Sequence, residues 1–258
     1  MKAHRCNPGC TKARQSAEVV LREHPDSIGA DFARRTERPN DYGTLSAIVD
    51  ERARKAPHYF CDGPAGKGGA GGADRRREGP ARASRYPNST AVVHLRLGDT
   101  IDGEQVERFD DVWRRGVAPY VLPGPFYEEL ARRVLPKLGV RRVVLVASAN
   151  HGHPKNVTAA SRAHVMSKRY RQRVRAAFAA SLTSEGVTDR FDAEPDDDFL
   201  LMASGSCARF LVLGGGGFSA AAGEVLRRRG GVRIWDGGAR GVVIEGQAWE
   251  LSPYVDAG

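Results

Sequence analysis

Short apolar runs alternate with amphipathic stretches from residue 90 onward. Strands are predicted at residues 90–97, 141–148, 208–214 and 232–238, where apolar and β-branched residues dominate. Helices are predicted at residues 124–139, 160–186, 196–206 and 219–231, where apolar residues recur at helical spacing. Residues 190–194 form a short strand at best. This alternation predicts an α/β fold, a Rossmann-like parallel sheet with helices on both faces.

The first ninety residues have a different character. Residues 1–43 are polar and weakly periodic, and residues 41–56 carry the apolar spacing of an amphipathic helix. Residues 62–89 are rich in Gly, Ala, Arg and Pro, which is typical of a linker. The predicted division is an N-terminal helical or irregular segment (1–61), this linker (62–89), a Rossmann-like domain (90–245) and a C-terminal tail (246–258).

The chain is basic, with 40 Lys and Arg against 31 Asp and Glu and a formal charge of +9. Such a balance is compatible with nucleic acid, an anionic membrane or a phosphate-bearing substrate. The arginines occur in dispersed pairs and triplets, and no predicted face combines regular Arg with interleaved aromatic residues, so nucleic acid is disfavoured as a partner.

No apolar run approaches the ~20 residues of a membrane span, and the N-terminus lacks the apolar core of a signal peptide. The chain as given is therefore expected to be soluble. Its compartment stays open, because the glycosylation sequons at Asn88 and Asn156 point weakly to the secretory pathway. Cys6 and Cys10 lack the further spaced ligands of a zinc site and are expected to be free thiols, whereas Cys207 is expected in the core.

The segment "HLRLGD" (94–99) places unusual residues at the end of the first predicted strand. His94 and Arg96 lie on the same face, because side chains in a strand alternate. Polar groups on a buried strand need partners, and the planar Arg fork suits phosphate oxygens. Asp99 either orients this Arg or caps the turn that follows.

The segment "GGGGFS" (214–219) joins another predicted strand to a helix. Glycines allow positive φ and close backbone approach, and a helix N-terminus attracts anions. Ser219 is expected to be the N-cap of this helix or a phosphate ligand. The alternative is a tight turn with a capping serine. Since ligands bind beyond the carboxyl ends of parallel strands, both segments are expected at one site.

The pattern H-x-R-x-G-D after an apolar strand resembles the signature of the GDP-fucose-dependent fucosyltransferases. The resemblance extends over residues 90–235 and implies the C-terminal half of a GT-B-type glycosyltransferase, with the N-terminal half reduced or irregular. It implies that Arg96 binds the β-phosphate of GDP-fucose, that His94 and Gly98 shape the strand end, and that Asp99 is the acidic position of the motif. His94, Arg96 and Asp99 are the predicted catalytic residues.

The second half of the resemblance is "DDDFLLMASGSCARFLVLGGGGFSAAAGEVLRRRG" (196–230). It implies that the turn after the later strand contacts the donor phosphate. The implied donor-binding residues of this half are Gly216, Gly217, Phe218, Ser219 and Asp198. Asp198 corresponds to the acidic residue that faces guanine, although Asp196 and Asp197 compete for that role. A solvated helix start is the alternative interpretation of these three aspartates.

The function that the resemblance implies is transfer of fucose from GDP-fucose to a glycan or protein hydroxyl. Neither a cofactor nor a metal is expected, because no convincing D-x-D motif is present and Arg96 with the helix end would stabilise the leaving charge. His94, Asp99, His151 and His153 are open candidates for the general base. A non-catalytic nucleotide-binding module is the second hypothesis, and a basic nucleic-acid-binding protein is the third.

Overall fold

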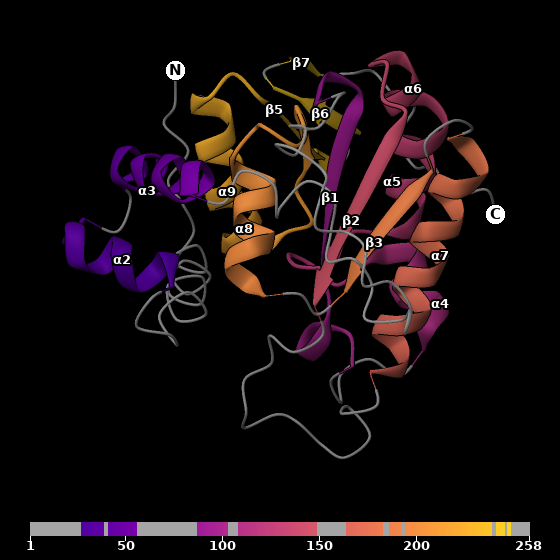
Figure 1. Ribbon diagram of the computed structural model, residues 1–258. Helices are drawn as coiled ribbons and strands as arrows, with labels where there is room; N and C mark the ends of the chain where they lie inside the picture. The colour runs from indigo at the N-terminus through magenta and orange to yellow at the C-terminus, as the bar shows by residue number, and fades with distance from the viewer. Residues whose placement is uncertain are drawn as a thin grey trace, which may run out of the picture.

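The computed structural model describes residues 27–38, 41–55, 87–102, 108–148, 164–182, 186–191, 194–238, 241–245 and 247–248. Within these residues, seven strands form one sheet in the order β3-β2-β1-β4-β5-β6-β7 (Figure 1). They are β1 (Thr90–Arg96), β2 (Arg142–Ser148), β3 (Val187–Phe191), β4 (Phe210–Val212), β5 (Val232–Asp236), β6 (Val242–Ile244) and β7 (Gln247–Ala248). The pairs among β1 to β5 are parallel, while β6 and β7 continue the sheet in antiparallel fashion.

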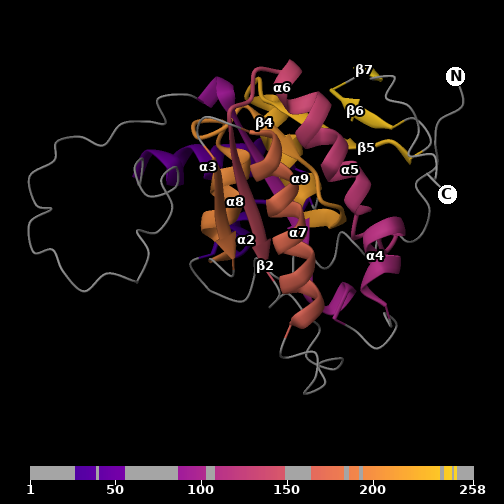
Figure 2. The same cartoon turned by 90° about the vertical axis from the view of Figure 1, so that its right-hand side faces the viewer.

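Helices cover both faces of the sheet, as the alternating pattern predicts. They are α2 (Ile28–Arg35), α3 (Tyr42–Lys55), α4 (Phe109–Arg115), α5 (Gly124–Glu129), the π-helical turn η3 (Leu130–Val134), α6 (Leu135–Lys137), α7 (Val165–Ser181), α8 (Pro195–Ala203) and α9 (Gly216–Arg228), with short 3₁₀ turns η1 (Pro87–Ser89) and η2 (Gly98–Thr100). Helices α4 to α7 lie on one side, and α2, α3, α8 and α9 lie on the other (Figures 1 and 2).

Strand β1 divides its side chains between two cores. Ala91, Val93 and Leu95 face the core under α4 to α7, whereas Val92 faces the core under α8 and α9. The alternation of a strand then places His94 and Arg96 on the α8/α9 side. The predicted α/β fold and the shared face of these two polar residues are therefore confirmed.

The connections reverse direction between β1 and β4. The chain leaves β1 and β2 through helices on one face, and it leaves β3 and β4 through α8 and α9 on the other face. Because β1 and β4 are neighbours in the sheet, this reversal is the topological switch point at which parallel sheets bind ligands. Residues 96–99 and 213–217 follow these two strands, so both predicted segments lie at the switch point.

Two helices begin earlier than the sequence predicts. Helix α8 begins at Pro195, since proline lacks the N–H that a first helical position leaves unbonded. Asp196 is therefore in the first turn, and Glu194 is the N-cap. Helix α9 begins at Gly216, with Gly215 at the N-cap and without a side-chain cap. The predicted N-cap role of Ser219 is therefore wrong.

Other elements depart from the pattern that the sequence presents. Helix α2 lies within residues predicted to be irregular, and its N-terminus is capped by the Ser27 hydroxyl, which accepts from the Ala30 N–H at 3.1 Å. Strand β3 begins at Val187 rather than at residue 190, and α4, β6 and β7 were not predicted. These elements are short, with too few periodic positions for the pattern to be recognised.

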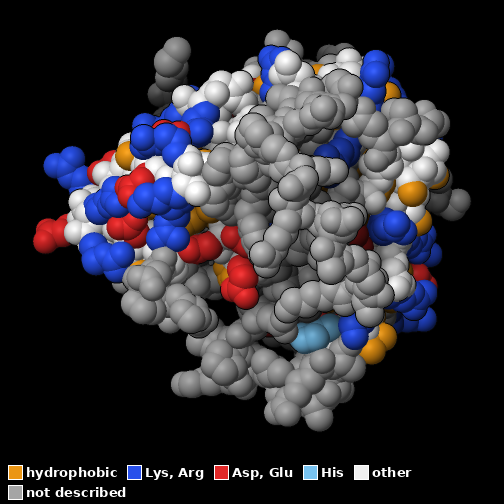
Figure 3. Space-filling model, viewed as in Figure 1, with side chains coloured by type: hydrophobic (Ala, Val, Ile, Leu, Met, Phe, Trp, Pro, Cys, Tyr) orange, Lys and Arg blue, Asp and Glu red, His pale blue; other side chains and the backbone are white. Residues whose placement is uncertain are grey.

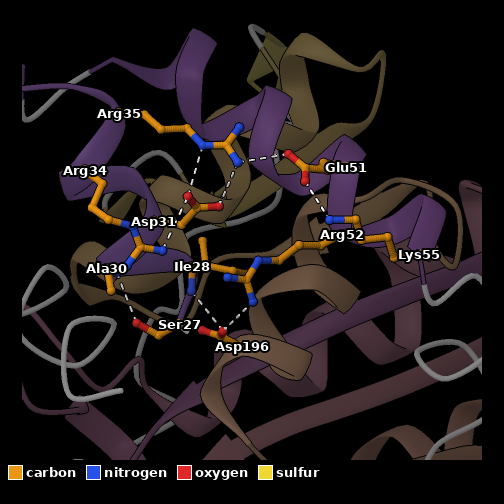
Figure 4. Close-up of polar contacts among 10 residues, drawn as sticks. All are labelled: Ser27, Ile28, Ala30, Asp31, Arg34, Arg35, Glu51, Arg52, Lys55 and Asp196. Atoms are coloured by element: carbon orange, nitrogen blue, oxygen red, sulfur yellow. Dashed lines mark hydrogen bonds and ion pairs between the residues drawn. The ribbon is translucent and has the colours of Figure 1, made fainter. Parts of the chain in front are cut away.

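The N-terminal helices share a core with the Rossmann-like part. Ile28, Ile48 and Val49 are fully buried in the core that contains α8 and α9. The Asp196 carboxylate accepts from the Ile28 N–H at 2.9 Å and from the Arg52 guanidinium at 3.2 Å (Figure 4). Helix α8 is thus fastened to both N-terminal helices by one carboxylate.

Charged side chains of both signs intermingle on the outer surface of α2 and α3 (Figure 3). Glu51 contacts Arg35 at 2.9 Å and Lys55 at 2.7 Å, and these cations lower its pKa to about 2. The three side chains are exposed, so their contribution to stability is small. The apolar side of the helices holds them to the protein.

The first prediction tests whether α2 and α3 belong to the cooperative unit. Ile48→Ala removes a fully buried side chain and should destabilise the protein by about 2–5 kcal/mol. Chemical denaturation followed by circular dichroism measures this loss. Ala47→Ser, on the exposed side of the same helix, is the control and should change little. An Ile48→Ala protein as stable as wild type would mean that α3 packs independently.

Candidate functional site

His94 is buried at the end of β1, with 4% of its surface exposed. Its ring lies 5.8 Å from that of Phe218, which lies 5.5 Å from that of Phe199. The three rings join β1, α9 and α8 in one aromatic cluster. His94 is thus packed among these rings, and its predicted catalytic role stays a prediction.

Arg96 is held by the turn that follows it. Its guanidinium lies 2.8 Å from the Asp99 carboxylate and donates to the Leu97 carbonyl at 3.2 Å. About a fifth of the Arg96 side chain and a quarter of the Asp99 side chain are exposed. The prediction that Asp99 orients Arg96 is confirmed. A guanidinium fixed in this way at the switch point can meet an anion without reorganising.

Gly98 connects this turn to α7. Its φ is +72°, a conformation that favours glycine, and its N–H donates to the Ser167 hydroxyl at 3.0 Å. The predicted shaping role of Gly98 at the strand end is therefore consistent with its geometry. The contact joins the end of β1 to the beginning of a helix that follows β2.

The glycine turn is required by the protein's own backbone. A Cβ on Gly214 would lie 1.8 Å from the His94 carbonyl oxygen, and one on Gly215 would lie 2.4 Å from the Tyr120 carbonyl oxygen. Both distances are far below van der Waals contact. The first two glycines of "GGGG" are therefore explained without a ligand, as the alternative interpretation of a tight turn proposes.

Gly216 differs from these two positions. Its φ is +77°, but a Cβ there would meet only the Tyr120 ring, at 3.8 Å, which is ordinary contact. Gly216, Gly217 and Phe218 form the first turn of α9, where backbone N–H groups lack acceptors within the helix. This turn, rather than the glycine pair before it, offers amides to an anion.

The Ser219 hydroxyl is bonded to the protein's own backbone. The residue is fully buried, and its Oγ donates to the Gly215 carbonyl at 3.0 Å. Because α9 begins at Gly216, Ser219 falls at the fourth helical position, where a serine can bond the carbonyl four residues earlier. The predicted role of Ser219 as a phosphate ligand stays a prediction, and its hydroxyl proton is already bonded to the Gly215 carbonyl.

The three consecutive aspartates of α8 have three environments. Asp198 is 3% exposed and forms a buried ion pair with Arg190, at 3.1 Å. Asp196 binds the N-terminal helices, as described above. Asp197 is only partly buried, and burial raises its pKa although Arg190 attracts its charge. Asp198 is paired with Arg190 and Asp196 with the N-terminal helices, and the predicted contact of Asp198 with the donor stays a prediction.

A further polar cluster lies where η2 meets α7. The Asp102 carboxylate accepts from the backbone N–H groups of Met166 at 3.0 Å and Ser167 at 3.1 Å, and it also contacts the Ser167 hydroxyl. Its other near neighbour is His164 Nδ1, at 3.3 Å. Sequence reasoning missed this cluster because 62 residues separate Asp102 from His164 and no motif links them.

Cys207 is 3% exposed in the core shared by α8 and α9, as predicted. It is also disulfide-bonded, and its partner is not among the described residues. Such bonds persist in oxidising compartments. The localisation of the chain nevertheless stays a prediction, and so do the interpretations of Cys6, Cys10, His151 and His153, which lie outside the described residues.

Within the described ranges, no group of three or more His, Cys, Asp or Glu side chains is placed to hold a metal ion. None of the helices described is both long and apolar enough to cross a bilayer. Metal independence stays a prediction.

Comparison with known protein families, with curated proteins and with solved structures finds no significant match for this chain.

The second prediction separates backbone packing from backbone strain in the glycine turn. Gly230→Ala introduces a Cβ at φ +79° into open space and should cost about 1–2 kcal/mol. Gly215→Ala combines a similar φ with the Tyr120 carbonyl and should cost on the order of 4 kcal/mol or more. Urea denaturation measures both. Equal losses would mean that the turn moves away from Tyr120 without cost.

The third prediction compares the effects on stability of replacing two neighbouring aspartates, Asp198 and Asp197. Asp198→Asn leaves the buried Arg190 charge without its partner and should cost about 3–5 kcal/mol. Asp197→Asn should instead stabilise the protein at neutral pH. Its folded pKa is raised above the ordinary 3.8, so the stability contributed by this group falls as the pH rises through the folded pKa.

Thermal melting of both variants and wild type at about pH 4 and about pH 7 measures these effects. The stability of Asp197→Asn should fall less than that of wild type between the two values. A melting temperature lowered by Asp197→Asn at pH 7 would contradict the prediction and would mean that attraction to Arg190 outweighs burial.

Proposed function

We propose that this chain is a fucosyltransferase-like glycosyltransferase that moves fucose from GDP-fucose to a hydroxyl of a glycan or protein. The observation that carries the proposal is the position of Arg96. It stands at the carboxyl end of β1, at the switch point of a parallel sheet, and is oriented by Asp99. A diphosphate leaving group requires such a site.

The neighbourhood of the two anion-binding elements supports this reaction. The His94 ring lies 5.8 Å from that of Phe218 in the first turn of α9. Arg96 follows His94 by two residues on the same face of β1, a rise of about 7 Å along the strand. In the proposed complex, the guanidinium and the helix amides both contact the diphosphate.

The choice of GDP-fucose rests on the resemblance of residues 94–99 and 196–230. Of the donor-binding residues that it implies, Arg96, Gly98 and the first turn of α9 keep their proposed roles, together with Asp99 as the orienting acid. Ser219 and Asp198 are bonded within the protein, and their donor contacts stay predictions. The GT-B architecture and the acceptor likewise belong to the proposal.

A non-catalytic nucleotide-binding module would use the same residues. It would bind GDP but would neither transfer nor hydrolyse the sugar. Incubation of the protein with GDP-fucose and a mixed glycan and peptide acceptor pool, followed by mass spectrometry, distinguishes the two functions. Release of GDP without a fucosylated product would indicate donor hydrolysis and would leave the acceptor to be identified.

One observation favours polyanion binding as a second candidate function. Arg169 and Arg173 of α7 lie over the rings of Phe109 and Trp113 of α4, at 4.1 and 4.2 Å. Helix α7 contains no acidic residue. Phe109 and Trp113 are buried, so the expectation that no face interleaves arginine with aromatic residues stays a prediction. Binding of a single-stranded RNA that falls steeply with salt and is lost in Arg169→Ala would support this function.

The fourth prediction concerns the guanidinium fork. Arg96→Lys keeps the positive charge but loses the planar pair of donors, so GDP affinity should fall by about 1–3 kcal/mol. Isothermal titration with GDP measures the change. Arg141→Lys, exposed before β2 at the opposite end of the sheet, is the control. Unchanged GDP affinity in a folded Arg96→Lys protein would show that Arg96 does not bind the diphosphate.

A further inference from the structure

The contacts described above form a continuous path from Arg96 to the beginning of α7. Arg96 binds Asp99, and the neighbouring Gly98 N–H donates to Ser167 at 3.0 Å. Ser167 in turn contacts Asp102, whose carboxylate lies 3.3 Å from His164 Nδ1. The imidazole is thus connected to the Arg96 turn through hydrogen bonds at the carboxyl ends of β1 and β2.

We propose that His164 is the general base of the sugar transfer and that Asp102 is its positioning residue. This inference rests on the proposed function and deepens it, since it names the group that activates the acceptor hydroxyl. The reaction class is proton removal from an alcohol.

The His164–Asp102 geometry is that of an oriented base. A carboxylate beside Nδ1 favours the tautomer in which Nδ1 carries the proton, so Nε2 has the lone pair. The Asp102 side chain is 3% exposed and that of His164 is 21% exposed. The orienting group is therefore shielded from water, while the imidazole remains accessible.

Capping of α7 does not explain the histidine. Asp102 accepts from the Met166 and Ser167 N–H groups directly, whereas the His164 side chain accepts from no N–H group of the helix and, among the described residues, contacts Asp102 alone. His164 also has a φ of +49°, the left-handed conformation, and among the described non-glycine residues no other has a positive φ. Such backbone strain is concentrated at functional positions.

The other described candidates for the base are occupied. His94 is buried against Phe218, and Asp99 is bound to Arg96. Among the residues that the structure describes at this end of the sheet, His164 combines partial exposure with an orienting carboxylate.

The step balances with these groups. The acceptor oxygen forms a bond to C1 of the fucose, and the bond between C1 and the β-phosphate oxygen breaks. The electron pair of that bond leaves with GDP, where Arg96 and the first turn of α9 stabilise the charge. The hydroxyl proton passes to Nε2 of His164 and then to solvent, which returns the imidazole to its starting state.

His164→Asn tests the inference, because asparagine tolerates the left-handed conformation but cannot act as the base. Transfer from GDP-fucose should fall by about 10²–10⁴-fold, while GDP affinity measured by titration should stay within about twofold of wild type. Lys168→Ala, on the exposed side of the same helical turn, is the matched control and should transfer at the wild-type rate.

His164→Gly gives a second readout, since it also accepts the backbone conformation and leaves space for a small base. Added imidazole should restore part of its transfer rate. Full activity in His164→Asn, or lost activity in both variants without imidazole rescue, would overturn the base assignment while the proposed function stands. A wild-type protein that neither binds GDP nor transfers fucose would overturn the proposed function itself.

Discussion

The arrangement at the switch point depends on one close approach between backbones. The turn after β4 passes so near the end of β1 that a Cβ on Gly214 would overlap the His94 carbonyl. Since the next residue also packs closely against the Tyr120 carbonyl, the beginning of α9 has little freedom. Backbone packing therefore sets the direction of the helix end, and a ligand would meet amides that are already in place.

This constraint changes the meaning of the glycine-rich motif. A run of four glycines after a strand suggests phosphate, but two of the four are needed whether or not a ligand binds. The groups that remain available to bind a ligand are the first turn of α9 and the Arg96 guanidinium. The buried ring of His94 packs near the partly buried ring of Phe218. Packing in the core therefore also sets the geometry of the site.

Local patterns account for what the sequence could predict. The strand–helix alternation, the shared face of His94 and Arg96, and the Arg96–Asp99 pair all depend on residues a few positions apart. Predictions failed where the role of a residue depends on the exact position at which a helix begins. Each helical residue turns the side chain by about 100°, so the early beginning of α9 carried Ser219 to the buried side, and Asp198 faces Arg190. The Asp102–His164 contact had no local signal at all.

The two halves of the proposed reaction draw on different elements that must keep a fixed separation. Negative charge is stabilised at the end of β1 and the beginning of α9, while the proton is taken at the beginning of α7. The Gly98–Ser167 hydrogen bond, together with the Asp102 cap, couples these elements. Because Ser167 is fully buried, water does not compete for this bond, which links the proposed base to the Arg96 turn. In the proposed reaction, such preorganisation would lower the barrier by holding the reacting groups in place.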